Sequence, residues 1–138
     1  MVVDTNVASE LMRPTPSPPV VAWVRTHTSQ IYATSVTIAE VLYGIERLAE
    51  SRRKDLLGVV AKDVFSAFAD RVLSFDAEAA VHYAGIVAAR ERAGAPISGF
   101  DAQIAAICRV HDATLATRNT GDFHDTGVRV IDPWGDDV

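Results

Sequence analysis

The chain has little cysteine: Cys108 is the only one among 138 residues. A single thiol excludes an internal disulfide framework and a zinc site made of several thiolates. Cys108 lies among Ile104, Ala105 and Ile107, which indicates a small buried core residue rather than a nucleophile. This usage is typical of the reducing cytoplasm, where we expect the protein to act.

Long apolar runs are also absent. The most apolar stretch, residues 77–89, contains His82 and Tyr83 and is too short to span a bilayer. The chain opens Met-Val-Val-Asp, with an acid where the apolar run of a signal peptide would continue. We therefore expect neither a membrane segment nor a signal peptide.

Several common catalytic motifs are missing as well. The four histidines show no HExxH spacing. There is no phosphate-binding glycine loop of the two common types, and no Gly-x-Ser-x-Gly turn. These absences argue against zinc-protease, dinucleotide-binding, kinase and serine-hydrolase chemistry.

The size and composition suit one folded domain. Hydrophobic residues make up 49% of the chain, so we predict a single domain over residues 1–138 with a substantial core. The net charge of −5 counts against passive nucleic-acid binding, but not against an enzyme that meets RNA through metal ions. The basic clusters at residues 52–54 and at Arg90 and Arg92 are interpreted as solvated helix faces.

Short apolar runs alternate with helical patterns along the chain. Strands are predicted at residues 1–4, 31–34, 72–75, 114–117 and 128–131. Helices are predicted at residues 7–12, from Pro19 onward, after a cap at Ser35 or Thr37, at 51–68, from the cap Asp76 to Gly94, and from the cap Ser98 to about His111. The alternation predicts an α/β domain in which helices flank both faces of a mainly parallel central sheet.

Acidic residues follow the predicted strands. Asp4 ends the first strand, and Asp122 comes a few residues after the strand at 114–117. Glu40 and Asp101 lie in the first turns of helices. Ligands of such sheets bind beyond the carboxyl ends of the strands, so these four acids could meet at one edge. An all-oxygen site of this kind suits Mg²⁺ or Mn²⁺.

Each acid also has an ordinary structural interpretation. Asp4 can cap a helix, and Asp122 lies in a turn-rich segment. Glu40, taken alone, is interpreted as solvated because it lies off the apolar stripe of its helix. Asp101 lies on the apolar face of its helix, which is a costly place for an unpaired carboxylate. The residues alone therefore support a hypothesis, an acidic site at one sheet edge.

The apolar stripes of two helices set further expectations. The stripe beside Glu40 comprises Ile38, Val41, Leu42 and Ile45, and that of the next helix includes Leu56 and Leu57. Gly44 lies one turn beyond Glu40 on the same face. A mid-helix glycine costs about 1 kcal/mol relative to alanine, so we interpret Gly44 as marking the close approach of another group.

Four segments resemble the motifs of one family. They are Val3-Asp4-Thr5-Asn6-Val7, the run from Ser35 to Ile45 with Glu40 and Gly44, Phe100-Asp101-Ala102-Gln103-Ile104-Ala105, and the run from Ala116 to Phe123 with Asp122. Their order and spacing are similar to those of the PIN-domain family, and within it of the VapC and FitB type toxins of bacterial toxin–antitoxin pairs. The resemblance covers nearly the whole chain.

The resemblance implies a ribonuclease with a compact parallel sheet. It implies that Asp4, Glu40, Asp101 and Asp122 form an acidic quartet that binds Mg²⁺ or Mn²⁺, with Glu40 holding a second ion or orienting the attacking water. The metal activates water for attack on a phosphodiester, leaving a 5′-phosphate and a 3′-hydroxyl. Supporting roles are expected for Thr5, Asn6 and Asn119, which would orient the acids, and for Arg118, which would contact phosphate.

The resemblance also implies partners. Toxins of this type are expected to form homodimers and to be inhibited by a small VapB-like antitoxin whose tail enters the acidic groove. Operator DNA would be bound through the antitoxin and not through this chain. The acidic net charge agrees with a basic inhibitor.

Two other classes of function stay open. The first is a non-catalytic binding module that keeps the fold and works through its partner. The second is another magnesium phosphohydrolase or a phosphoacceptor domain, but Asp4 is followed by Thr5 and Asn6 rather than by a second acid. The only lysines, Lys54 and Lys62, also precede the last strands, where a phosphoacceptor domain would need one.

Overall fold

A computed structural model describes residues 1–135 and contains five short strands, all paired in parallel. They are β1 (Val2–Val3), β2 (Ala33–Thr34), β3 (Val72–Leu73), β4 (Leu115–Ala116) and β5 (Val130–Ile131). One set of strands has the order β1-β4-β5, and β2 pairs with β3. A parallel bridge between Val2 and Tyr32 joins the two sets, giving the order β3-β2-β1-β4-β5. The predicted parallel sheet is confirmed, with strands shorter than expected.

Six α-helices and one 3₁₀ helix lie between and around these strands. They are α1 (Thr5–Leu11), α2 (Pro18–Thr26), α3 (Ser35–Glu46), α4 (Arg52–Ser66), α5 (Ala77–Arg92), α6 (Gly99–Val110) and the 3₁₀ helix η1 (Thr120–Phe123). The predicted caps Asp76 and Ser98 are confirmed, because their side chains accept hydrogen bonds from the helix backbone. The cap of α3 was predicted at Ser35 or Thr37 and lies instead at Thr34, whose hydroxyl accepts from Thr37 N at 3.0 Å.

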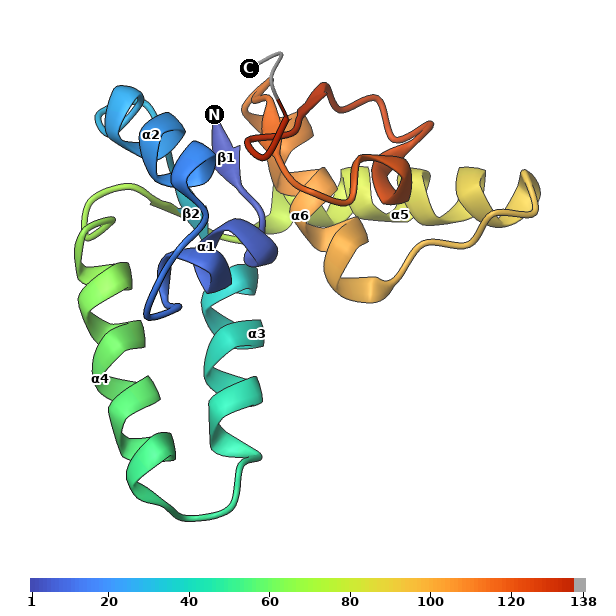
Figure 1. The fold of residues 1–138 in the computed structure, drawn as a ribbon. Helices are drawn as coiled ribbons and strands as arrows, with labels where there is room; N and C mark the ends of the chain where they lie inside the picture. The colour runs from blue at the N-terminus through green and yellow to red at the C-terminus, as the bar shows by residue number, and fades with distance from the viewer. Residues whose placement is uncertain (136–138) are drawn as a thin grey trace.

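Helices cover both faces of the sheet, as predicted (Figure 1). Val2 and Val3 are adjacent in β1 and point to opposite faces, as residues of a strand must. Val2 packs in a core cluster with α5 and α6 residues, including the fully buried Cys108, whose assignment to the core is confirmed. Val3 packs in a second cluster with residues of α1 and α2, including Trp23. The sheet therefore separates two apolar layers.

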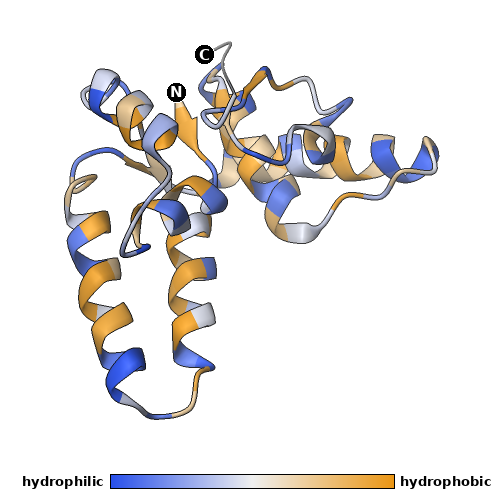
Figure 2. Ribbon diagram, in the orientation of Figure 1, coloured by the Kyte–Doolittle hydropathy of each residue, from blue (hydrophilic) through white to orange (hydrophobic). Residues whose placement is uncertain are grey.

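Helices α3 and α4 run side by side and extend away from the sheet as an arm (Figure 1). Two residues of the predicted apolar stripes are exposed on this arm, Leu42 by 47% and Leu56 by 61%. Figure 2 shows apolar positions along the length of both helices. These positions stay exposed because α3 and α4 pack against each other along the arm, and this contact cannot cover every apolar position.

The interpretation of Gly44 is also wrong within this chain. A Cβ atom built on Gly44 would meet nothing within 4 Å, so no neighbouring group requires a glycine there. Gly94, by contrast, ends α5 as expected and has a φ angle of +75° that favours glycine. Among the helices described, none is both long enough and apolar enough to cross a membrane.

Candidate active site

A pocket of about 490 Å³ opens beside the carboxyl ends of β1 and β4. Three of the predicted acids line it, each from a different part of the chain: Asp4 after β1, Glu40 on α3 and Asp101 on α6. The four predicted supporting residues, Thr5, Asn6, Arg118 and Asn119, line the same pocket. Strand ends and helix starts thus converge on one edge of the sheet, as expected for a parallel α/β domain.

Asp4 is the most buried of these acids, with 4% of its surface exposed. It caps α1 by accepting a hydrogen bond from Thr5 N at 2.8 Å, and its other oxygen accepts one from the Thr117 hydroxyl at 2.8 Å. Burial raises the pKa of Asp4 to about 6, against the lowering effect of both hydrogen bonds. Charges on Asp101 and Glu40 raise this pKa further. A carboxylate that is buried and repelled by two others is costly to ionise, so its charged form needs a positively charged partner.

Glu40 is half-buried and is held by a threonine on α1. The Thr5 hydroxyl donates to Glu40 Oε1 at 2.8 Å and lies 3.1 Å from the Thr37 hydroxyl. Burial raises the pKa of Glu40, and the charge of Asp101 adds to this rise. The solvated interpretation of Glu40 is therefore wrong, because its side chain turns into the pocket against α1.

Asp101 is half-buried in the first turn of α6, whose cap Ser98 accepts a hydrogen bond from Asp101 N at 3.2 Å. Burial raises the pKa of Asp101, and the charge of Asp122 raises it further. Asp122 itself is exposed on η1 and lines a smaller neighbouring cavity of about 200 Å³. Asp101 borders both spaces, so it links Asp122 to the other two acids.

The acids approach one another without forming a closed ligand set. Across residues 1–135, no three His, Cys, Asp or Glu side chains lie close enough together to be grouped as a metal site. The donors are nevertheless all carboxylate oxygens, and the pKa values of three of them are raised. Such a set fits a hard divalent cation, since a bound cation would offset both burial and mutual repulsion.

Two threonines that the sequence reading did not identify support the acids. Thr117, fully buried after β4, accepts hydrogen bonds from Asn6 Nδ2 at 3.1 Å and Asn119 N at 3.0 Å while donating to Asp4. Thr37 contacts Thr5 beside Glu40. Thr37 precedes Glu40 by three residues on one helix, and this spacing was the available signal.

Asn6 joins the first and fourth motifs. Its amide oxygen accepts from Arg118 N at 3.3 Å, and its Nδ2 lies 3.5 Å from Asp4 Oδ2. Arg118 is exposed, and its guanidinium lies 5.3 Å from the centre of the Trp134 ring. Thr5 and Asn6 thus contact the acids directly, as orienting residues would, whereas Asn119 acts through its backbone N–H on Thr117, and Arg118 lines the pocket.

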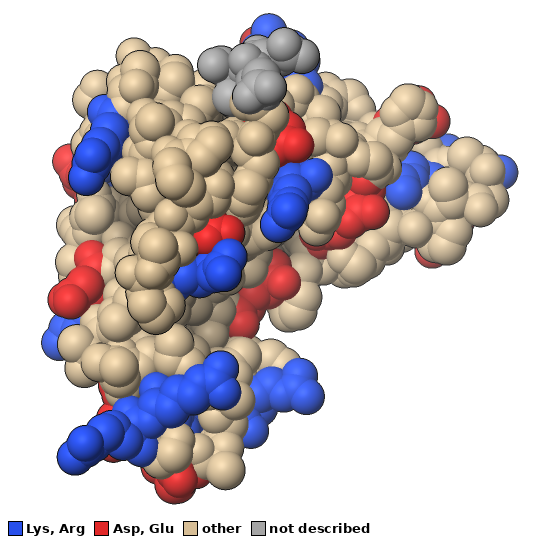
Figure 3. Space-filling view, in the orientation of Figure 1, with Lys and Arg blue, Asp and Glu red and all other residues tan. Residues whose placement is uncertain are grey.

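A second arginine at the pocket was also missed. Arg13 is 65% exposed, and its Nη1 lies 3.2 Å from both carboxylate oxygens of the buried Glu10. Figure 3 shows Lys and Arg side chains beside acidic ones across the middle of this face. Arg13 and Arg118 thus give the acidic pocket two cationic neighbours.

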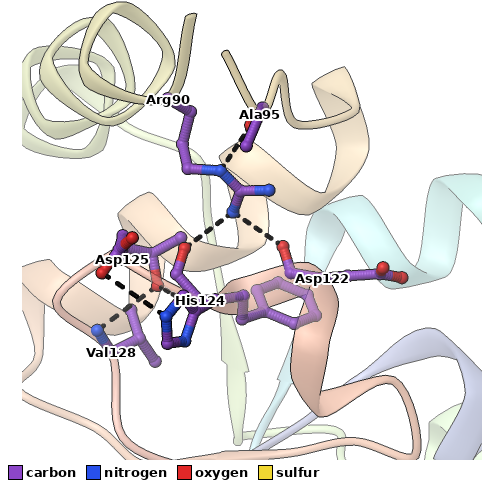
Figure 4. Close-up of polar contacts among 8 residues, drawn as sticks. Arg90, Ala95, Asp122, His124, Asp125 and Val128 are labelled. Carbon is purple, nitrogen blue, oxygen red and sulfur yellow. Dashed lines mark hydrogen bonds and ion pairs between the residues drawn. The ribbon is translucent and has the colours of Figure 1, made fainter. Parts of the chain in front are cut away.

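Arg90 corrects another expectation. It was interpreted as part of a solvated helix face, but only 8% of it is exposed. Its Nε donates to the carbonyl of Ala95 at 2.6 Å, and its Nη1 donates to the carbonyls of Asp122 at 3.0 Å and His124 at 2.8 Å (Figure 4). The end of α5 is thereby bonded to the segment that carries Asp122.

Comparison with known proteins gives a consistent result. The family model described as PIN domain matches residues 1–128. Toxin FitB of Neisseria gonorrhoeae is 36% identical over 138 residues, covering 99% of each chain. A VapC ribonuclease of Sinorhizobium fredii, named Y4jK, is 34% identical over 136 residues, covering 97% of each chain.

Solved structures agree in fold. A structure of FitAB bound to an IR36 DNA fragment contains a chain that is 36% identical, with a TM-score of 0.87 and coverage of 97% of this chain and 95% of that one. A DNA-bound VapBC structure from Salmonella typhimurium contains a chain that is 26% identical, with a TM-score of 0.84 and 96% coverage of both chains.

Proposed function

The chain belongs to the PIN-domain family, and from this premise we propose that it is a metal-dependent endoribonuclease, the toxin of a toxin–antitoxin pair. The observation that carries the proposal is the convergence of Asp4, Glu40 and Asp101 on one pocket, with Asp122 beside it. A relative named as a toxin and one named as a ribonuclease match nearly the full length of the chain, which supports one nuclease domain over residues 1–138.

In this proposal Asp4, Asp101 and Asp122 hold Mg²⁺ or Mn²⁺, and Glu40 acts on the attacking water beside the ion. Such an ion, when bound, lowers the pKa of water and offsets the negative charge that develops on the phosphate. Asp4 suits a ligand role because it is buried and already fixed by two hydrogen bonds. The raised pKa values of Asp4, Glu40 and Asp101 support the need for a cation.

The protein's own side chains would prepare water and phosphate. Glu40, held by the Thr5 hydroxyl at 2.8 Å, would orient the attacking water and accept its proton. Arg118 and Arg13 would donate to nonbridging phosphate oxygens, for which a guanidinium is well shaped. Attack of the water oxygen on phosphorus breaks the bond to the 3′ oxygen, which takes up a proton from solvent, so the products carry a 5′-phosphate and a 3′-hydroxyl.

We also propose that the chain pairs with itself and with a VapB-like antitoxin, which would carry the contact with operator DNA. The related FitAB and VapBC structures are described as bound to DNA. The exposed apolar residues of the arm, which include Leu42, Tyr43, Leu56 and Val59, support protein contacts on that surface.

The test is cleavage of total cellular RNA by antitoxin-free protein in Mg²⁺ or Mn²⁺. Parallel samples contain EDTA or the Asp4→Asn variant. Asp63→Asn is the matched control, because Asp63 is exposed on α4 away from the pocket. Discrete cuts that bear 5′-phosphates are expected from the wild-type and control proteins in metal.

Both EDTA and Asp4→Asn should abolish these cuts. Cutting that survives both treatments would contradict the metal-dependent mechanism. A folded wild-type protein that cuts no RNA would favour the non-catalytic binding module instead. A full-length Asp4→Asn protein with a normal circular dichroism spectrum is required for either conclusion.

A further inference from the structure

Arg90 is a buried cation whose hydrogen bonds all go to uncharged carbonyl groups. In the described chain it makes no ion pair with a carboxylate within 4.0 Å. Burial of a charge without a charged partner is costly, and a neutral side chain would often be more stable in such a place. The presence of a cation here therefore calls for a reason other than packing.

The surroundings of Arg90 supply that reason. It lines the cavity of about 200 Å³ together with Ser98, Asp101 and Asp122, so its charge faces two of the four acids. Its Nε and Nη1 are engaged with backbone carbonyls (Figure 4). Its Nη2 has no hydrogen bond among the residues described.

The segment that carries Asp122 is also held by contacts other than those to Arg90. Phe123 anchors it in the core, with 2% of its surface exposed, and the Thr126 hydroxyl donates to the Phe123 carbonyl at 2.6 Å. Arg90 bonds the carbonyls on either side of Phe123, those of Asp122 and His124. Backbone hydrogen bonds from Asp122 N to Asn119 O at 3.1 Å and from His124 N to Gly121 O at 3.2 Å close the 3₁₀ turn. These bonds and the two anchors would keep the segment folded without Arg90, whereas Arg90 ties its carbonyl groups to the end of α5.

We infer that Arg90 is a positioning residue for the acidic site. It fixes the backbone that presents Asp122, it bonds the connection that leads into α6 and Asp101, and its charge offsets the repulsion between these two acids. The inference rests on the proposed metal-dependent ribonuclease. Arg90 lies outside the four motifs, and in this role it positions Asp101 and Asp122 for binding a divalent cation.

The experiment compares Arg90→Gln, Arg90→Lys and the control Arg92→Gln. Arg92 lies in the same last turn of α5 and is exposed. Two quantities are measured, the Mg²⁺ concentration for half-maximal RNA cleavage and the amide hydrogen exchange of residues 119–126 with and without Mg²⁺. The exchange readout does not depend on catalysis.

Arg90→Gln should raise the half-maximal Mg²⁺ concentration about 10- to 100-fold, the usual effect of losing a group that orients metal ligands. Saturating Mg²⁺ should restore most of the rate. Residues 119–126 should exchange faster in Arg90→Gln, and Mg²⁺ should protect them less than in the wild type. Arg90→Lys keeps the charge but can make fewer hydrogen bonds, so its Mg²⁺ requirement and its amide exchange should lie between those of the wild type and Arg90→Gln. Arg92→Gln should match the wild type in both quantities.

Faster exchange with an unchanged Mg²⁺ requirement would overturn the inference, because Arg90 would then be structural only. An equal effect of Arg92→Gln would also overturn it. If Arg90→Gln does not fold, Arg90→Lys decides, and a wild-type Mg²⁺ requirement in that variant would count against the role. If the wild-type protein cuts no RNA, the proposed function fails by itself, and Mg²⁺ protection of residues 119–126 that depends on Arg90 would still support the positioning role.

Discussion

At the scale of single residues, the site depends on carboxylates that are costly to ionise in the folded chain. The pKa of Asp4 rises from 3.8 to about 6, mainly because the residue is buried. Between these two values the native state holds a proton that the unfolded state has released. The free energy of unfolding of the metal-free protein therefore falls as pH rises through this window, and it stays lowered above pH 6.

The raised pKa of Asp4 predicts how the stability of Asp4→Asn depends on pH in EDTA. In the wild type, a rise of about 2 in the pKa of Asp4 lowers the unfolding free energy by about 3 kcal/mol between pH 4 and pH 7. The amide of Asp4→Asn does not ionise, so this part of the fall should be absent in the variant. Urea unfolding at a series of pH values measures it, with Asp63→Asn as the control. A decline in Asp4→Asn as steep as that of the wild type would show that Asp4 ionises without cost.

Thr117 supports a second prediction at this scale. Thr117→Val keeps the shape of the side chain but removes the hydroxyl that donates to Asp4 and accepts from Asn6 and Asn119. We expect a loss of about 1–3 kcal/mol in unfolding free energy and a fall of about 10- to 100-fold in cleavage rate. Thr26→Val is the control, since Thr26 is exposed on α2.

Calorimetry and single-turnover cleavage separate the two effects. An unchanged cleavage rate in a folded Thr117→Val protein would mean that Asp4 is positioned well enough by its bond from Thr5 N. A variant that loses stability alone would assign Thr117 to the core and not to the site.

The limits of sequence reading are clearest among these residues. The family motifs pointed to Asp4, Glu40 and Asp101, because acids at strand ends and helix starts fall at one edge of a parallel sheet. The burial of Arg90 was not foreseeable, since its partners are backbone carbonyls, which carry no residue-type signal, and those of Asp122 and His124 are more than 30 positions away. The partner of Arg13 was only three positions away at Glu10, and that helical spacing could have indicated it.

At the scale of elements, periodicity and capping residues located the helices well. Asp76 and Ser98 were predicted as caps because their side chains can accept from free N–H groups of a first turn. The exposure of Leu42 and Leu56 was not predictable in the same way. Periodicity gives the direction of an apolar stripe, but whether something covers that stripe depends on how many helices pack beside it.

The end of the α3–α4 arm makes a prediction about RNA. Arg47, Arg52 and Arg53 are exposed there, and Figure 3 shows Lys and Arg side chains spread across it. Lys54 is paired with Glu50 at 2.7 Å, so the arginines carry most of the available charge. If RNA reaches this end, changing both Arg52 and Arg53 to Gln should weaken RNA binding and make its salt dependence shallower by about 1 for each lost phosphate contact.

Binding is measured in the Glu40→Gln background at several salt concentrations, so that the RNA is not cut. Arg25→Gln, which alters an exposed residue of α2, is the control. An unchanged salt dependence in the double variant would confine the RNA to the pocket and exclude the arm from its path.

At the scale of the whole molecule, the chain carries a net charge of −5 while its proposed substrate is a polyanion. Acids are gathered at the pocket, and arginines lie beside it and at the end of the arm. The overall charge therefore describes the surface poorly, because a divalent cation at the acids would make the pocket less negative than the sequence suggests.

This arrangement predicts that divalent metal stabilises the native state. Burial and mutual repulsion make these carboxylates costly to ionise, and a cation would offset that cost. The carboxylates come together only in the folded chain, so the ion binds the native state and stabilises it by mass action. At a Mg²⁺ concentration about 100 times the dissociation constant, the stabilisation is about 2.7 kcal/mol, or roughly 5–10 °C in Tm for a domain of this size. Differential scanning calorimetry at constant ionic strength measures it.

The variants decide where the ion binds. Asp4→Asn and Asp101→Asn should each lose most of the Mg²⁺-dependent rise in Tm, whereas Asp63→Asn should keep it. Each of the two site variants should also be at least as stable as the wild type in EDTA at pH 7, because a neutral amide removes a charge that burial opposes. The same rise in Tm in all three variants would place the ion elsewhere on this acidic surface, and the raised pKa values of Asp4, Glu40 and Asp101 would then need another explanation.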